Sequence, residues 1–395
     1  NVPSTLADPA WWQHMVTFGV SIGLQGRLDP ANDLKAIELG SKHWGDPTDA
    51  EDADRIDDLW HAAVNGHGNF VSARNPTEFA QALADALSTV AARLGSASNV
   101  TANTTSFTAG SRVYQASYVS GRWVGELAAY DATAAGVADT PAWHASTRIA
   151  YAGRNVVTWN GTAGASFPTP AQVTALTRTT GIAPVAGAAN ANYIKGDWGS
   201  ERRMGGTLRN RDSLLGDIAN SSPMYAIDSN TLFVGANDGM LHAFDASSGN
   251  ELFAYVPGGL DLSWLSTLSD PQYAHKYFVD GPIVVSSNKQ TPGRNVLVGA
   301  LGRGGKGLFA LDVTTPASFS ASNAMWELRD NGGDMGMVLG DPLIVTLNDA
   351  AKTKAAIVSN GINSTNGHAV LFVVDLMTGT VLKKIDTGNQ GADNG

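Results

Sequence analysis

The sequence contains no cysteine, which excludes disulfide bonds, thiolate metal sites and cysteine nucleophiles. It also lacks any run of about 18 apolar residues, the length that a membrane-spanning helix needs. Basic residues are outnumbered, with 26 Lys and Arg against 36 Asp and Glu, and the net charge is −10. This balance argues against nucleic acid and anionic membranes as main partners, and it leaves cations and basic protein surfaces open.

Catalytic signatures are missing as well. No G-x-S-x-G elbow occurs, and no pair of histidines has the H-E-x-x-H spacing of a metal site. The segment Gly302–Gly307 resembles a phosphate-binding loop only superficially, because it lacks the Gly-Lys-Ser/Thr ending and no helix follows it, so we predict a hairpin turn. We predict structural or surface roles for all the histidines, namely His14, His43, His61, His67, His144, His242, His275 and His368. We therefore predict no catalytic, cofactor-binding or metal-binding residue in this chain, and no enzyme.

The first part of the chain mixes strand and helix signals. Met15–Val20 is typical of a buried strand, and Ile56–Asn65 is typical of a short helix that Gly66 ends in the left-handed conformation. The acidic run Asp46–Asp58 lacks the spacing of a calcium-binding loop, so we favour a solvated loop and helix N-terminus over a calcium site. The acidic turn Asp330–Asp334 also lacks full ligand spacing.

A second helix is predicted after Asn75. This residue is a suitable cap, Pro76 suits the first helical position, and Glu78 completes a capping box. Apolar residues recur at helical spacing from Phe79 to Leu94. We interpret residues 1–95 as a small α/β region, 96–108 as a Ser/Thr/Asn-rich linker, and 109–395 as an all-β domain.

An internal repeat decides the fold prediction. Similar strands follow Pro223, Pro282 and Pro342, and proline at the start of a strand removes no ladder hydrogen bond. Each copy continues through three more short strands, and the residues from Val113 to Trp143 form an earlier, weaker copy. Four antiparallel strands per unit of about 60 residues predict the blades of a β-propeller, with four to five blades in an incomplete ring. A linear β-solenoid is the alternative.

Individual positions in the repeat have predicted roles. The turn Asn237–Gly239 is a strong hairpin signal, for which two central residues with positive φ are expected. The Asp that follows each third strand is expected to hydrogen-bond its own turn. Trp143 and Trp326 occupy equivalent last strands, where packing between blades is expected and a sugar-stacking adhesin surface is the alternative.

Several long motifs match a known family. Leu215–Pro223, Phe233–Asp245 and Phe253–Pro257 closely resemble the C-terminal domain of the PilY/PilC family of type IV pilus biogenesis factors. Upstream, Ile56–Gly66 and Phe70–Pro76 are similar to the family's link between a von Willebrand A-like region and the propeller. The resemblance covers most of the chain.

The resemblance implies a secreted, pilus-associated protein of the periplasm or outer surface with a quinoprotein-like propeller. Family members promote pilus extension by opposing retraction, lie at the pilus tip with minor pilins, and support surface adhesion and twitching motility. The family also has a regulatory calcium loop and an Asp-x-Ser-x-Ser adhesion motif, and neither is matched here. We expect the chain to be a fragment, with a signal upstream and the calcium loop and further blades downstream of Gly395.

Two alternative functions remain. A quinone-dependent dehydrogenase shares this style of propeller, but such an enzyme needs inward-facing charged groups and a calcium ion, and many also use a vicinal cysteine pair. A propeller scaffold for outer-membrane assembly is the other alternative, and it predicts envelope defects with normal pili.

Overall fold

The computed structural model describes most of the chain in two compact units, Asn1–Ser96 and Ala97–Gly395, which are considered separately. The described residues are 15–30, 32–73, 75–76, 78–80, 95–102, 111–133, 136–329 and 332–390. No helix within these ranges has the length and hydrophobicity needed to span a bilayer.

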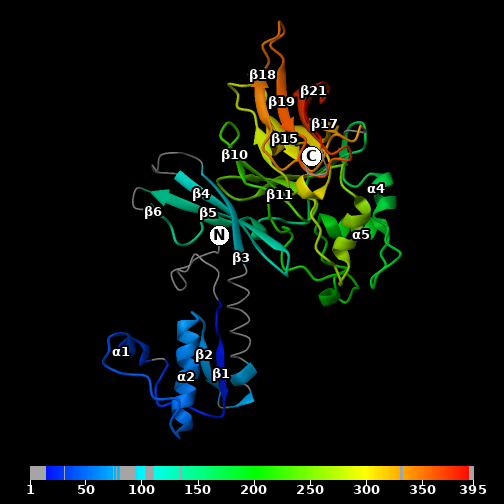
Figure 1. Cartoon of the computed structure of the whole chain (residues 1–395). Helices are drawn as coiled ribbons and strands as arrows, with labels where there is room; N and C mark the ends of the chain where they lie inside the picture. The colour runs from blue at the N-terminus through cyan, green and yellow to red at the C-terminus, as the bar shows by residue number, and fades with distance from the viewer. Residues whose placement is uncertain are drawn as a thin grey trace. The chain divides into compact units, whose positions relative to one another are not determined.

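The described residues of the first unit include the strands β1 and β2 and the helices α1 and α2 (Figure 1). The strands β1 (Gly19–Ile22) and β2 (Phe70–Ala73) pair in parallel. Between them in sequence come the helices α1 (Leu34–Glu38) and α2 (Asp52–Asn65). α2 packs against both strands and buries Trp60, so this unit has the α/β character that the sequence predicted.

The boundaries in this unit correct three expectations. β1 begins at Gly19 and not at Met15. α2 begins at Asp52 and not at Ile56, because acidic residues in a first turn stabilise the positive end of the helix dipole. The left-handed residue after α2 is His67, with φ of 51°, whereas Gly66 has φ of −86°.

The second predicted helix is described only at its start. The Asn75 side-chain oxygen accepts a hydrogen bond from the Glu78 backbone N–H at 3.0 Å, as the capping prediction requires. The apolar positions from 81 to 94 lie outside the described residues. The predicted linker is partly wrong, because Gly95–Ala102 forms strand β3, which joins the first blade. A Ser/Thr/Asn-rich composition suits an edge strand as well as a linker when Thr and Val are interspersed.

The described strands of the second unit form four sheets, which confirms the mainly β, propeller-type prediction (Figure 1). The three later blades are four-stranded meanders, as the repeat predicted. The first blade contains β3, β4 (Ser111–Val119), β5 (Val124–Thr133), β6 (Gly136–Val137) and β7 (Trp143–His144). The second contains β10 (Met224–Ala226), β11 (Thr231–Ala236), β12 (Met240–Asp245) and β13 (Glu251–Val256). The third contains β14 (Ile283–Val285), β15 (Val296–Ala300), β16 (Leu308–Asp312) and β17 (Ala324–Leu328). The fourth contains β18 (Leu343–Thr346), β19 (Lys354–Ser359), β20 (His368–Asp375) and β21 (Val381–Gln390).

Consecutive blades pack face to face through three apolar clusters. Blades one and two share a cluster that includes Leu127 and Phe244, and blades three and four share one that includes Val298 and Phe372. Between blades two and three, Tyr255 and Phe309 lie 5.4 Å apart, ring centre to ring centre. Burying both faces of each middle sheet is what a radial stack of blades achieves, so the described sheets form an incomplete propeller.

The two predicted tryptophans close two of these interfaces. Trp143 donates its Nε1–H to the Ala246 carbonyl oxygen at 3.2 Å, across the interface between the first and second blades. Trp326 donates its Nε1–H to the Leu376 carbonyl oxygen at 2.9 Å, across the interface between the third and fourth blades. Both side chains are only 4% exposed, so they pack between blades as predicted and do not form a sugar-stacking surface.

The turn beneath each indole ring contains a glycine. A side chain at Gly249 or Gly379 would come within 2.7 Å of the tryptophan ring, and both glycines have positive φ. The interface between blades two and three is built differently, because Phe253 takes the tryptophan position and stacks on Phe319 at 3.6 Å. Phe319 lies in the connection between β16 and β17, which is longer than the corresponding connection between β12 and β13. This longer connection contributes the aromatic ring that packs against Phe253.

The turn residues behave mostly as predicted. Asp245, Asp312 and Asp375 each accept hydrogen bonds from the backbone of the turn that follows, which confirms their structural role. In the turn between β11 and β12, however, only Gly239 has positive φ. Ala236 pairs with Met240, so the loop has three residues, and such loops need only one left-handed position.

An insertion between the first two blades was not predicted. It contains β8 (Val156–Trp159), β9 (Gly164–Ser166), α4 (Pro170–Ala175) and α5 (Gly187–Lys195). β8 lies parallel to β13 and extends the second blade to six strands. A short helix, α6 (Leu262–Leu265), lies in the connection from the second blade to the third. The insertion covers the outer edge of the second blade and brings new polar groups to it.

Candidate functional site at the turn end of the second blade

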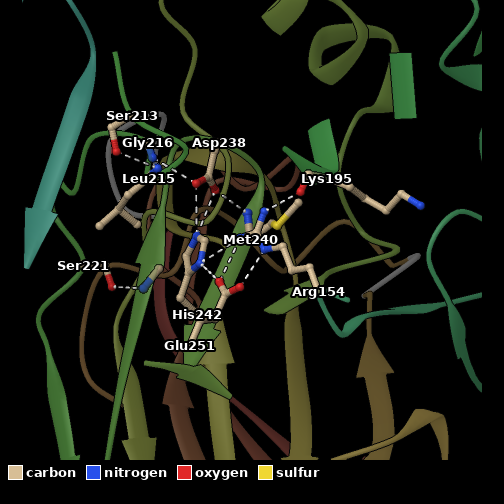
Figure 2. Close-up of polar contacts among 11 residues, drawn as sticks. Arg154, Lys195, Ser213, Leu215, Gly216, Ser221, Asp238, Met240, His242 and Glu251 are labelled. Carbon is tan, nitrogen blue, oxygen red and sulfur yellow. Dashed lines mark hydrogen bonds and ion pairs between the residues drawn. The ribbon is translucent and has the colours of Figure 1, made fainter. Parts of the chain in front are cut away.

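A histidine of β12 is buried between two carboxylates. His242 is fully buried, and its Nε2 lies 3.0 Å from an Asp238 oxygen, while its Nδ1 lies 2.7 Å from a Glu251 oxygen. Asp238 comes from the turn before β12, and Glu251 is the first residue of β13. Figure 2 shows the imidazole ring held between the two acids.

Arg154, at the start of the insertion, completes a quartet of alternating charges. Its guanidinium meets Glu251 through two nitrogens, at 2.6 and 2.8 Å (Figure 2). A third nitrogen donates to the Lys195 carbonyl at 3.0 Å, at the end of α5. On the other side, Asp238 accepts the Gly216 backbone N–H at 2.9 Å. The quartet therefore joins the blade to both ends of the insertion.

The charges in this quartet fix its protonation. Burial disfavours a charged imidazole, but the two carboxylates outweigh burial and raise the pKa of His242 to about 9. Burial likewise opposes a charged Glu251, but Arg154 and His242 lower the pKa of Glu251 to about 2. His242 is thus protonated at neutral pH and shielded from solvent, so it cannot accept a proton from a substrate.

A second polar cluster lies beside the quartet. Asp217, only 1% exposed, accepts hydrogen bonds from the Asn237 side chain at 2.8 Å and contacts His275 Nε2 at 2.9 Å. Trp123, in the turn between β4 and β5, stacks on His275 with ring centres 3.8 Å apart. Trp123 has a φ of 57°, a conformation that is unusual for a bulky residue. The cluster links the turns of the first and second blades to the connection that leads to the third.

The space between these turns is small. A cavity of about 30 Å³ is lined by Trp123, Arg209, Asp217, Asp238 and Tyr273, among others. That volume suits about one water molecule. The turns at this end of the blade are therefore closely packed.

The acidic run in the first unit is only partly solvated, which corrects the prediction. Asp54 and Asp57 are each 2% exposed. Asp57 accepts the backbone N–H of Arg27 at 3.1 Å, and Asp54 lies 3.2 Å from the Arg27 guanidinium. The two carboxylates point inward because they meet Arg27, in the loop that precedes α1. Asp54 neutralises the charge of the Arg27 guanidinium, and Asp57 accepts the Arg27 backbone N–H. Across the described residues, no three side chains of His, Asp or Glu gather as a metal site.

The other predicted positions are dispersed. Gly302–Gly304 forms a tight turn between β15 and β16, which confirms a hairpin connection in place of a phosphate loop. Asp330 lies outside the described residues, whereas Asp334 pairs with Lys384 at 3.0 Å.

Three of the other histidines make separate contacts. His61 stacks on Trp44, His144 lies 3.3 Å from Glu126, and His368 lies 3.0 Å from Asp386. His14 is outside the described residues. Sequence reasoning missed Arg154 and Asp217, which no repeat marks. The spacing of Asp238 and His242 within one motif was the available signal for the quartet.

Repeated meander blades that pack face to face define this chain as a β-propeller protein. Residues 215–395 match a family model described as the PilY1 beta-propeller domain, and this part of the chain belongs to that family. The matched segment begins at Leu215 and includes three members of the quartet.

Curated relatives extend the similarity upstream. The type IV pilus biogenesis factor PilY1 of Pseudomonas aeruginosa is 32% identical over an alignment that covers 98% of this chain and 38% of the relative. A PilY1 homolog of Xylella fastidiosa is 43% identical over 49% of this chain and 15% of the relative. The crystal structure of the P. aeruginosa PilY1 C-terminal domain is 36% identical over 41% of this chain and 31% of that one, with a TM-score of 0.33. The chain thus spans well under half the length of these relatives.

Proposed function

We propose that this chain is part of a type IV pilus biogenesis factor and that it acts as a non-enzymatic structural module. The observation that carries this proposal is the similarity to named pilus biogenesis factors along 98% of the chain. The geometry supports a structural role, because the conspicuous titratable residue, His242, is sealed between two acids.

Finer parts of the proposal follow from the resemblance of the motifs. We propose that the whole protein is secreted, associates with minor pilins at the pilus tip, opposes pilus retraction, and supports adhesion and twitching motility. Residues 1–95 would be the end of a von Willebrand A-like region and its connector. Calcium would bind in the full-length protein, as the resemblance to the family implies.

Gene deletion tests the proposal. We expect loss of surface pili and of twitching, and we expect pili to return when retraction is also disabled. Complementation with the wild-type gene should restore twitching, whereas complementation with Glu251→Ala should restore it poorly because the second blade is destabilised. Normal pili after deletion would contradict the proposal, and envelope defects with normal pili would favour an outer-membrane assembly scaffold.

A further inference from the structure

Five cationic side chains gather near the joint between the second and third blades without carboxylate partners. Across the described residues, no Asp or Glu oxygen lies within 4.0 Å of their charged nitrogens. They are Arg209, Lys276, Arg303, Lys306 and Arg329. Many other arginines of this unit do have such partners, for example Arg154, Arg211 and Arg294. What distinguishes the five is that they lie in the connection between two blades and in the turns beside it.

Three of these cations lie over aromatic rings. The Arg209 guanidinium is 4.6 Å from the centre of the Tyr273 ring. Lys276 Nζ is 4.5 Å from the Trp264 ring. The rings hold the cations in place by attraction to their negative faces, but they carry no charge that would neutralise them.

The rings also connect to one another. Tyr273 lies 6.5 Å from His275, and His275 lies 4.9 Å from Tyr277, ring centre to ring centre. Arg303 then lies over Tyr277 at 5.4 Å. The contacts therefore run without a break from Arg209 to Arg303, across the connection between β13 and β14.

The chain topology places these residues at one end of the blades. Trp264, Tyr273 and Tyr277 follow β13, the last strand of the second blade. Arg303 and Lys306 lie in the turn between the second and third strands of the third blade, and in an antiparallel meander this turn is at the end where the last strand finishes. Arg329 follows β17 at the same end and donates to the Gly258 carbonyl at 2.7 Å. The cations thus share one surface.

The carboxylates nearest to this surface are already engaged. Asp280 is 1% exposed and accepts two hydrogen bonds from Asn220, at 3.1 and 2.6 Å. Asp217 is equally buried and contacts His275. Asp261 caps α6 by accepting the backbone N–H of Ser263 at 2.9 Å. Two exposed carboxylates remain at this surface, Asp261 near Lys276 and Asp341 beside Arg303. They are outnumbered by the exposed cations Arg303, Lys306 and Arg329.

We propose that this surface binds an acidic segment of a partner protein. We call it the cation–aromatic row and define it by Arg209, Trp264, Tyr273, Lys276, Tyr277 and Arg303. Fixed cations on rings lose little side-chain freedom when they meet carboxylates, and Trp264, 46% exposed, adds apolar contact area. The choice of a protein partner rests on the proposed function in pilus assembly, which is a process of protein association.

Binding of a short fluorescent peptide of alternating Glu and Ser to the whole chain tests this proposal, with fluorescence anisotropy at low salt as the measurement. The triple variant Arg209→Gln, Lys276→Gln, Arg303→Gln should bind about tenfold more weakly, since three ion pairs that are each weak would be lost together. Added salt should weaken the wild-type complex, because exposed charges are screened.

A matched control variant replaces exposed lysines outside the row, Lys289→Gln, Lys352→Gln and Lys383→Gln, and it should bind like the wild type. If the triple variant fails to fold, Arg303→Gln with Lys306→Gln, both exposed, should still weaken binding severalfold. Equal weakening by the control variant would overturn the proposal. So would binding of an alginate oligosaccharide without binding of the peptide. Because the measurement does not involve pili, its failure is distinct from failure of the proposed function.

Discussion

Three blades place different residues at the same position of the third strand. Counting back three residues from the Asp that ends each strand gives His242 in the second blade, Phe309 in the third and Phe372 in the fourth. All three side chains are buried, at 0%, 1% and 0% exposure. Two blades therefore fill this position with an apolar ring, and the second blade fills it with a charged one.

The position beside it on the last strand of each blade is also charged in the second blade and apolar in the third and fourth. Glu251 in the second blade corresponds to Ala324 in the third and Val381 in the fourth, because each lies opposite the residue after the same bulge. The second blade thus replaces an apolar pair by a charged pair. The difference coincides with the insertion, which supplies Arg154, and we infer that the charges fix the insertion to the blade in one arrangement. Buried ion pairs contribute little net stability, but they are costly to leave half-formed.

Removing one acid from the quartet should have the largest effect. Glu251→Ala leaves the protonated His242 and Arg154 buried without their shared partner, and breaking a buried pair in this way costs about 3–5 kcal/mol. Urea unfolding of the whole chain, followed by tryptophan fluorescence, measures the loss as a lower midpoint.

The matched variant is His242→Phe, which introduces the residue of the third and fourth blades. It leaves Glu251 paired with Arg154, and Asp238 still accepts the Gly216 N–H, so no buried charge loses all its partners. We expect less than half the loss caused by Glu251→Ala. An equal or larger loss would show that the histidine ring, and not the balance of charges, stabilises this blade.

The second prediction concerns pH. The folded-state pKa of His242 is about 9, above its ordinary value near 6.5, so its stabilising contribution is complete below pH 6.5 and is lost as the pH rises towards 9. The wild-type free energy of unfolding should fall over this window by an amount on the order of a few kcal/mol, which lowers the urea midpoint. His242→Phe should show a much flatter profile. A wild-type profile that is flat from pH 6.5 to 9 would contradict the assigned protonation.

The repeated part of the fold was largely predictable from the sequence. Pro223, Pro282 and Pro342 mark blade starts because a strand tolerates proline only where no ladder hydrogen bond is lost, and β10, β14 and β18 each begin at the next residue. Repetition makes such local rules reliable, since an error in one copy is corrected by the others. The insertion between the first two blades has no second copy, so its strands and helices were missed.

The site was less predictable. The quartet combines Arg154 with Glu251, which are 97 residues apart, and local patterns carry no information about such pairing. The cation–aromatic row has the same origin, since Arg209 and Tyr273 meet only in the folded chain. Negative net charge pointed away from a basic surface, because it averages over residues that the fold separates.

The smallest effect should come from the indole hydrogen bond between the third and fourth blades. Trp326→Phe keeps an aromatic ring at the interface but leaves the Leu376 carbonyl without its donor, which costs about 1–3 kcal/mol for a buried group. The reverse change, Phe253→Trp, should bring no matching gain, because the ring at this position already stacks on Phe319. Thermal unfolding of both variants measures the asymmetry. A stabilised Phe253→Trp protein would show that the interface between blades two and three can also accept an indole. The identity of the ring, and not the length of the connection between β16 and β17, would then distinguish the two interfaces.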